Sequence, residues 1–360
     1  MGKKWLLAAA VALALCGSAA RAVPDTPYDP DLMLWYPVLT AEQQRIFDLC
    51  YRAAAQGQET VQLPQGSSYT DACVAMDALL RDCPELSWLD RYYAVRYYQQ
   101  SPDEATQISL RINGSAGESA HLAAAAELAA GAQAVDAWKL ALNLHDALCE
   151  AVVYGEGARA HDAYGALAEG QAVCEGYAGA YALACRLAGI RCGVVTGTAT
   201  DGEGGLMNHA WNLVDFGGSA MLVDVTWDDQ DSLGRIEHSY FGLTDAWAAA
   251  DHFEESALAR PPCQDEELNW HARQGMTLGA MEIPALQSWW EERLALLRDG
   301  SARTVEARFL DEDTFHAFLT YQDSWLEEFN QRMGAQGLYG SWSILVTEAQ
   351  RIFSMTMLSP

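Results

Sequence analysis

Apolar and polar residues follow two periods along the chain, and each period predicts one kind of element. A helical spacing of apolar residues marks 41–56, where Ile46, Phe47 and Cys50 recur on one face. Alternating apolar and polar residues mark strands instead, as around Ile108 and Ile112. The elements expected before residue 153 are a helix at 41–56, a strand at 59–63, a helix at about 69–82, a strand at 86–98, a strand around 108–112, and Ala-rich helices over 117–152 that break near Gly131.

The composition changes after Pro261 and Pro262, which marks a further unit. Its pattern predicts a helix at 284–298, a strand at 303–309, a helix at 312–332, and strands near 341–346 and 351–358. The domains expected from these patterns are a signal peptide at 1–22, an N-terminal α+β unit at 23–113, a catalytic domain at 114–260 and a C-terminal α+β unit at 261–360. The aromatic residues of 86–98 are expected in the core rather than on a sugar-binding surface.

The first residues have the features of a secretory signal peptide. Lys3 and Lys4 precede an apolar run of eleven residues, 5–15, and Ala20-Arg21-Ala22 fits the cleavage rule. The run is shorter than the roughly 20 residues that a membrane span needs. Lipidation at Cys16 is the alternative, but Leu15 is bulky for that motif. We therefore expect cleavage near Ala22 and a secreted protein without a membrane span.

The net charge and the apolar content of the chain exclude some classes of function. The chain has 22 Lys+Arg against 49 Asp+Glu, a net charge of −27, and half of its residues are apolar. That apolar content excludes a disordered polyelectrolyte. The negative charge argues against nucleic acid as a partner, because phosphate binding needs clustered cations.

Eight cysteines follow the signal segment, and none is spaced with another cysteine or a histidine as in a zinc motif. The sequence therefore predicts neither a metal nor another cofactor. Cys73–Cys83 and Cys185–Cys192 are candidate local disulfides, since export permits them. Buried free thiols are the favoured interpretation of each pair.

Cys174 stands where a helical pattern begins, and Gly189 is a plausible end of that helix. The helix dipole and the unpaired N–H groups at a helix start favour an anion, so we expect them to stabilise the thiolate. On the following hairpin, Gly217-Gly218 is a turn signal. A two-residue turn there sets His209 opposite Thr226 with Asp224 diagonal to it, whereas a loop over 215–218 sets His209 opposite Asp224.

Both registers place the imidazole of His209 and the carboxylate of Asp224 within reach on one face. Asp224 is expected in the middle of a strand that runs to Trp227, where a carboxylate needs a partner. A thiol, an imidazole and a carboxylate in this order predict a nucleophilic triad, in which His209 deprotonates Cys174 and Asp224 orients His209. Asp228 and Asp229 are interpreted as turn residues.

Residues 150–253 resemble the bacterial transglutaminase-like superfamily. The matching pieces are VCEGYA around Cys174, HAWN around His209, VDVTWDD around Asp224, HDAYGAL from His161, and Tyr240-Phe241 ahead of His252. The resemblance implies an α+β fold with a papain-like core, in which the helix of Cys174 packs on an antiparallel sheet. It also implies thioester chemistry on amide bonds of protein, peptide or cell-wall material, with either an amine or water as acceptor.

The remaining site residues are weaker candidates. Gln171 and Tyr164 are candidates for the second oxyanion donor because they lie near Cys174 in the sequence. His161 and Trp211 are candidates for the cleft wall, and a surface position is the alternative for His161. Trp227 is expected on the opposite face, in the core. The alternative functions are a cysteine protease or amidase on the same fold and a catalytically silent surface binding or scaffolding protein.

Overall fold

The computed structural model describes residues 28–200, 205–230, 235–256, 258–336 and 340–359. The predicted signal peptide and its cleavage site lie outside these residues. The chain forms two compact units, one that ends at Asp265 and one that starts at Glu266. Among the described helices, none combines the length and the apolar character that crossing a membrane requires.

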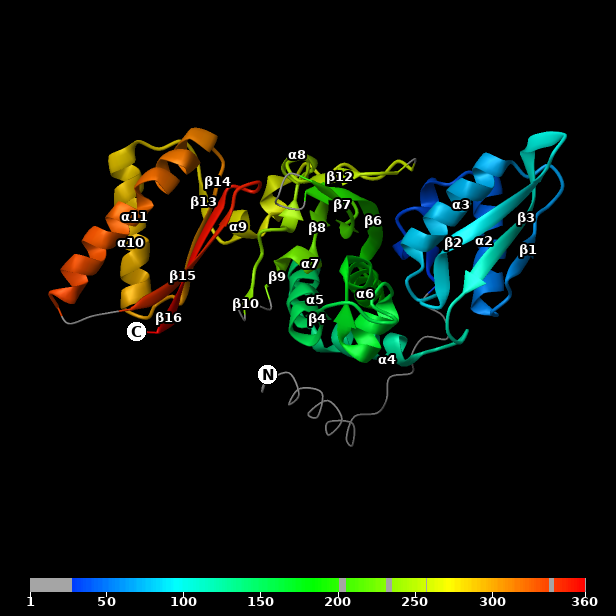
Figure 1. The fold of residues 1–360 in the computed structure, drawn as a ribbon, viewed down its shortest axis with the longest axis horizontal. Coiled ribbons are helices and arrows are strands. Elements are labelled where there is room, and N and C mark those ends of the chain that lie inside the picture. Colours follow the sequence, from blue (N-terminus) through cyan, green and yellow to red (C-terminus); the bar gives the residue numbers. More distant parts are fainter. Residues whose placement is uncertain (1–27, 201–204, 231–234, 257, 337–339, 360) are drawn as a thin grey trace, which may run out of the picture. The chain divides into compact units, whose positions relative to one another are not determined.

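The N-terminal part of the first unit packs two helices on a three-stranded antiparallel sheet of order β1-β3-β2 (Figure 1). The elements are α2 (Ala41–Ala55), β1 (Thr60–Gln62), α3 (Tyr69–Asp82), β2 (Leu89–Tyr98) and β3 (Ser101–Ile112), with short 3₁₀ turns at Pro30–Leu32 and Tyr36–Val38. Thr40 and Gln43 form a capping box at the start of α2, and Ser68 caps α3.

The aromatic residues of β2 correct one prediction. Tyr93 packs against the core, but Tyr92, Tyr97 and Tyr98 are each more than half exposed. A strand alternates its side chains between two faces, so a run of consecutive aromatic residues cannot all be buried when one face of the sheet is open.

Buried charges stabilise this N-terminal part and, through one ion pair, join it to the rest of the first unit. Asp82, at the end of α3, accepts hydrogen bonds from the backbone N–H groups of Leu34, Trp35 and Tyr36. Arg186 donates through Nη2 to Glu85 Oε2 at 2.6 Å, and both side chains are buried. Residues before and after the predicted boundary at 113 thus belong to one compact unit. The predicted boundary at 260 lies near the division seen at Asp265.

The predicted catalytic part contains helices and a five-stranded sheet of order β11-β8-β7-β6-β12. Its helices are α4 (Ala120–Gly131), α5 (Ala137–Ala151), α6 (Cys174–Leu187), α7 (Val225–Asp228) and α8 (Asp245–Ala248), with a π-helical turn η4 (Gly165–Glu169). Its strands are β4 (Val153–Tyr154), β5 (Gln171–Ala172), β6 (Arg191–Thr200), β7 (Leu206–Asp215), β8 (Ala220–Val223), β9 (Asp229–Gln230), β10 (Arg235–Ile236), β11 (Phe241–Leu243) and β12 (His252–Glu254).

Helix α6 packs on β6 and β7 of this antiparallel sheet. Asn212 on β7 is fully buried and donates to the carbonyl of Ala178 on α6 at 2.9 Å, which fixes helix to sheet. Helix α6 ends at Leu187, and the predicted stop Gly189 follows the C-cap Ala188 with a φ of +84°. The fold is α+β, with the helix of Cys174 on an antiparallel sheet.

The hairpin of β7 and β8 adopts the two-residue turn. Phe216 N–H donates to Ser219 O at 3.0 Å, and Leu213 pairs with Leu222. However, β8 ends at Val223, so the predicted strand to Trp227 is wrong in its second half. Asp224 is instead the N-cap of α7.

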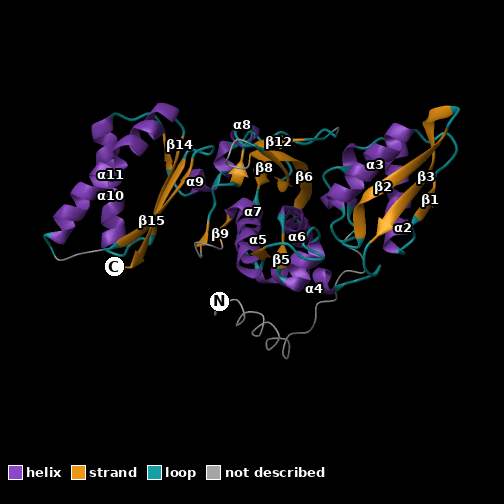
Figure 2. Ribbon diagram, in the orientation of Figure 1, coloured by secondary structure: helices purple, strands orange, loops and turns teal. Residues whose placement is uncertain are grey.

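The second unit packs α10 (Ile283–Arg298) and α11 (Glu312–Gly334) on a four-stranded sheet of order β13-β14-β16-β15 (Figure 2). Its strands are β13 (Thr277–Leu278), β14 (Thr304–Phe309), β15 (Ser341–Thr347) and β16 (Ile352–Ser359), and it begins with η6 (Glu266–Leu268) and α9 (Trp270–Arg273). The long helices and strands agree with the prediction. Trp290, Phe318 and Phe353 lie at the centre of its core.

Candidate active site

Cys174 is the first residue of α6 and is half-buried. Its N-cap, Val173, has no side chain that can bond the first N–H groups of the helix. Those groups are orphaned by helix geometry, so the start of α6 presents free donors beside the thiol. The backbone of Val173 is held in turn by a 3.0 Å hydrogen bond from its N–H to Ala160 O.

Gly176 explains part of the motif that follows the cysteine. A Cβ atom on Gly176 would lie 2.4 Å from Ala160 O and 2.8 Å from Ala172 Cβ. Real Cβ atoms do not approach so closely, so only glycine lets the first turn of α6 pack on the loop that carries residue 160. The thiol of Cys174 is positioned by this close approach.

His209 on β7 and Asp224 at the start of α7 are both buried and form a close pair. The distance from His209 Nε2 to Asp224 Oδ2 is 2.5 Å. Asp224 Oδ1 accepts the backbone N–H groups of Thr226 at 3.0 Å and Trp227 at 3.2 Å. The carboxylate therefore caps α7 with one oxygen and holds the imidazole with the other.

The thiol of Cys174 is the second polar group that acts on the imidazole of His209. Burial alone would lower the pKa of His209, but the charge and hydrogen bond of Asp224, together with the nearby Cys174 thiol, raise this pKa to about 10. His209 Nδ1 makes no hydrogen bond within normal geometry. Since Nε2 is occupied by Asp224, Nδ1 is the atom that is free to exchange a proton with Cys174, and catalytic hydrogen bonds are often loose without substrate.

A second buried histidine shares the same carboxylate. His252 Nε2 lies 3.1 Å from Asp224 Oδ2, and His252 Nδ1 lies 2.6 Å from Asp251 Oδ1. Tyr240 donates its hydroxyl to Asp251 Oδ2 at 3.0 Å. Burial opposes the charged form of His252, but both carboxylates raise its pKa. Asp224 thus lies between two imidazoles.

Two tryptophans enclose His209. The ring of Trp211 lies 6.0 Å from that of His209, nearly parallel to it, and the ring of Trp227 lies 5.0 Å away. The expectation that Trp227 faces away from His209 is wrong, because the chain leaves the strand at Asp224 and α7 turns Trp227 toward the ring. This apolar surround strengthens the interaction between His209 and Asp224.

The sequence profile described as Transglutaminase-like superfamily matches residues 122–227, which contain all three predicted triad residues. These residues form a transglutaminase-like domain. Human kyphoscoliosis peptidase is 42% identical over 109 residues, which cover 25% of this chain and 16% of the relative. The mouse protein of the same name is 34% identical over 109 residues, with the same coverage. The chain therefore spans about a sixth of the length of the curated relatives it matches.

Two solved structures share a more distant likeness with the chain. A candidate cysteine protease from Cytophaga hutchinsonii is 15% identical, with a TM-score of 0.25, over 38% of this chain and 61% of its own. A TGase is 13% identical, with a TM-score of 0.26, over 39% of this chain and 46% of its own.

The weaker site candidates of the transglutaminase-like domain contact different neighbours. His161 is half exposed and bonds Glu175, the residue after Cys174, which also pairs with Arg91 of β2. The amide of Gln171 lies against Gly155 in the loop before the π-helical turn. Tyr164 packs on the guanidinium of Arg159, 4.5 Å from its ring centre. Their roles in the oxyanion hole and cleft stay predictions.

Tyr154 is a further candidate for a residue near Cys174. It lies on β4, which pairs with β5 directly before Cys174, and half of its surface is exposed. Burial raises its pKa, and the negative charges of Cys174, Glu156 and Asp224 add to the effect. No sequence signal marks it, since the pairing of β4 with β5 comes from tertiary structure.

Asp228 also differs from its predicted role as a turn residue. It is fully buried at the end of α7, and its Oδ1 accepts the backbone N–H of Tyr240 at 2.9 Å. Asp229 accepts the hydroxyl of Tyr177 at 2.6 Å. Both carboxylates thus attach α7 to neighbouring elements.

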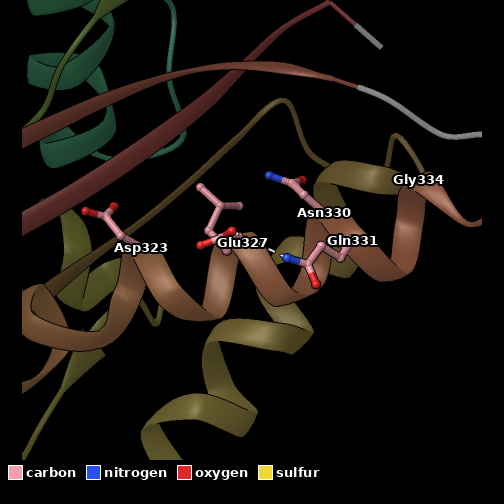
Figure 3. A pocket seen from close by; sticks show the side chains of 6 residues that line it. Asp323, Glu327, Asn330, Gln331 and Gly334 are labelled. Carbon is pink, nitrogen blue, oxygen red and sulfur yellow. Dashed lines mark hydrogen bonds between the residues drawn. The ribbon is translucent and has the colours of Figure 1, made fainter.

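The second unit has a hollow on α11 (Figure 3). The residues that line it are Asp323, Leu326, Glu327, Asn330, Gln331 and Gly334. It has neither a thiol nor an imidazole, and Gln331 donates to Glu327 across it at 3.4 Å. It therefore lacks the thiol and imidazole that the proposed chemistry needs.

Proposed function

We propose that the protein is an exported cysteine enzyme that cleaves amide or peptide bonds through Cys174, His209 and Asp224. The observation that carries the proposal is the 2.5 Å contact between His209 Nε2 and Asp224 Oδ2. It leaves Nδ1 for the thiol of Cys174, which lies at the uncapped start of α6. In this arrangement the imidazole both activates the nucleophile and protonates the leaving group.

In the first step the Cys174 thiolate attacks the substrate carbonyl carbon, and the carbonyl π electrons move to oxygen. The N–H groups at the start of α6, that of Cys174 included, stabilise this oxyanion. As the oxyanion collapses, the C–N bond breaks and His209 Nδ1–H transfers its proton to the leaving amine. The products are a free amine and a thioester on Cys174.

In the second step His209, now neutral, removes a proton from water, and the hydroxide attacks the thioester carbon. The C–S bond breaks, the acid leaves, and the thiolate and imidazolium are restored. An amine in place of water would give transamidation by the same steps. We favour water because the relatives that match this segment are both named peptidases.

The substrate class follows from the proposed site and the predicted export. We propose a protein, peptide or cell-wall amide outside the cytoplasm. Glu175, Arg91 and His161 form a polar rim beside Cys174, to which a peptide backbone or a charged side chain would bind.

Selective alkylation tests the proposed nucleophile. Iodoacetamide at mildly acidic pH should modify Cys174 much faster than Cys73, the other half-buried thiol among the described residues, and His209→Gln should abolish the difference. Peptide mapping by mass spectrometry measures both rates. Equal rates at the two thiols, unaffected by His209→Gln, would favour the scaffolding alternative.

Product analysis tests the reaction. The protein is incubated with a glutamine-containing peptide, with and without a primary amine, and quenched in acid to preserve a thioester. We expect the free acid in both samples and an acyl adduct on the wild type that Cys174→Ala loses and Cys73→Ala retains. An amine adduct in place of the acid would assign transamidation.

A further inference from the structure

A second cluster of histidines and carboxylates lies in the first unit, and the proposed triad does not use it. His145 and Asp146 are adjacent on α5, and His238 lies between β10 and β11. His145 Nδ1 and His238 Nε2 each lie 2.9 Å from the same atom, Asp146 Oδ1. These three donor atoms lie within 4.8 Å of one another.

This geometry is close to that of a metal site. Two imidazole nitrogens that hydrogen-bond one oxygen are directed at one point in space. In a tetrahedral zinc site, with bonds of about 2.0–2.1 Å, neighbouring ligand atoms are about 3.3 Å apart. To reach that spacing, the two imidazoles would move toward each other and the Asp146 oxygen would move back from them, starting from donor atoms that already lie within 4.8 Å of one another.

The surroundings of His145 have the second feature of a metal site. Its other ring nitrogen, Nε2, lies 3.3 Å from Asp228 Oδ2, and both side chains are fully buried. A histidine that binds a metal almost always donates its remaining N–H to a carboxylate or carbonyl, which fixes the tautomer. Asp228 is itself fixed by the N–H of Tyr240.

We propose that His145, Asp146 and His238 bind one Zn²⁺ ion, with Asp228 as the carboxylate that orients His145. Two imidazoles and a carboxylate are donors that suit zinc. With neutral imidazoles, the two carboxylates carry a charge of −2, which the ion cancels. The Asp146 side chain is 34% exposed, which leaves a path for the ion and room for water as the fourth ligand.

Such an ion would stabilise the position of α7 and would take no part in the proposed reaction. Asp228 ends α7, and Asp224 caps the start of the same helix. Zinc would therefore link α5 and the His238 segment to the helix that carries the carboxylate of the triad. The sequence does not predict this site, because His145 and His238 are far apart in the chain and form no local motif.

Metal titration of the purified full chain tests the proposal. After treatment with a chelator, isothermal titration with Zn²⁺ should give one site per chain. His238→Gln and Asp146→Asn should each weaken binding by at least about tenfold, while His316→Gln, at an exposed His–Glu pair on α11, should leave it unchanged. Circular dichroism identifies a variant that fails to fold. If His238→Gln or Asp146→Asn does not fold, the zinc affinity of the other variant tests the proposal.

Cobalt substitution separates this site from the thiols and from His209, Asp224 and His252, which also cluster. Co²⁺ should give visible absorption of a nitrogen and oxygen site, without the intense near-ultraviolet band of thiolate ligation, and His238→Gln should remove it. Zinc binding that is absent, that persists in folded His238→Gln, or that shows thiolate bands would overturn the proposal. Alkylation of Cys174 is measured separately, so failure of the metal site leaves the test of the proposed triad intact.

Discussion

Replacement of Asp224 by asparagine should destabilise the protein in a manner that depends on pH. The substitution keeps the size of the side chain and the cap of α7 but removes the charge that His209 and His252 share. Both histidines are buried. His209 loses the carboxylate that keeps it protonated, whereas His252 keeps Asp251 as a partner. The effect should therefore be largest where the wild type carries imidazolium.

The pKa of His209 gives the magnitude. Asp224 and Cys174 outweigh burial and raise it from 6.5 to about 10. At ~1.36 kcal/mol per pH unit, this difference corresponds to about 5 kcal/mol of stabilisation. Removal of one partner from a buried ion pair typically costs about 3–5 kcal/mol, which agrees. Because the folded pKa lies above the unfolded pKa, the stabilisation is complete below about pH 6.5 and is lost as the pH rises toward 10.

Urea unfolding followed by tryptophan fluorescence measures the effect, since Trp211 and Trp227 lie against His209. The gap in unfolding free energy between wild type and Asp224→Asn should narrow by about 2–4 kcal/mol between about pH 6 and pH 9.5. The exposed Asp103→Asn should show a small gap that does not change with pH. A gap for Asp224→Asn that stays constant, or that widens with pH, would refute a charged His209 held by Asp224.

Three further predictions follow from the contacts of the first unit. Gly176→Ala should lower the melting temperature and slow alkylation of Cys174, because the added Cβ would lie 2.4 Å from Ala160 O. Gly179→Ala on the same helix, with contacts of 3.4 Å or more, should be tolerated. His252→Gln should slow alkylation less than Asp224→Asn does, since the carboxylate still holds His209. Arg186→Met should cost about 3–5 kcal/mol in urea unfolding, because it leaves the carboxylate of Glu85 buried and unpaired.

Local pattern predicted the long elements of the chain well. The bounds of α2 and α3 and those of α10 and α11 follow from helical spacing, and Gly189 lies just after the end of α6 as its sequence indicates. Each of these depends on neighbouring residues alone, such as a cap, a glycine or an apolar stripe. The same holds for the position of Cys174 at the start of α6, which depends only on the apolar spacing of the residues that follow it.

Residues positioned by tertiary contacts were not predicted from the sequence. His252 reaches Asp224 from β12, which pairs with β6 rather than with β7 or β8, and no local spacing reveals this. The tyrosines of β2 were assigned to the core because the sequence does not show which face of a sheet is covered. Strand β6, a central strand of the five-stranded sheet, also lacked a clear signal.

The error at Asp224 explains how the proposed site is built. If the strand continued through Asp224, the N–H groups of the residues after it would pair within the sheet. The carboxylate would then bond His209 alone. Because the chain leaves the sheet after Val223, two N–H groups of α7 fill Oδ1, and Oδ2 is free for two imidazoles. The charges and hydrogen bonds of His209 and His252 lower the pKa of Asp224 despite its complete burial, and the two N–H groups of α7 fix the orientation of the carboxylate. His209 is thereby fixed on the side of Nε2, and only Nδ1 remains to exchange a proton with the thiol.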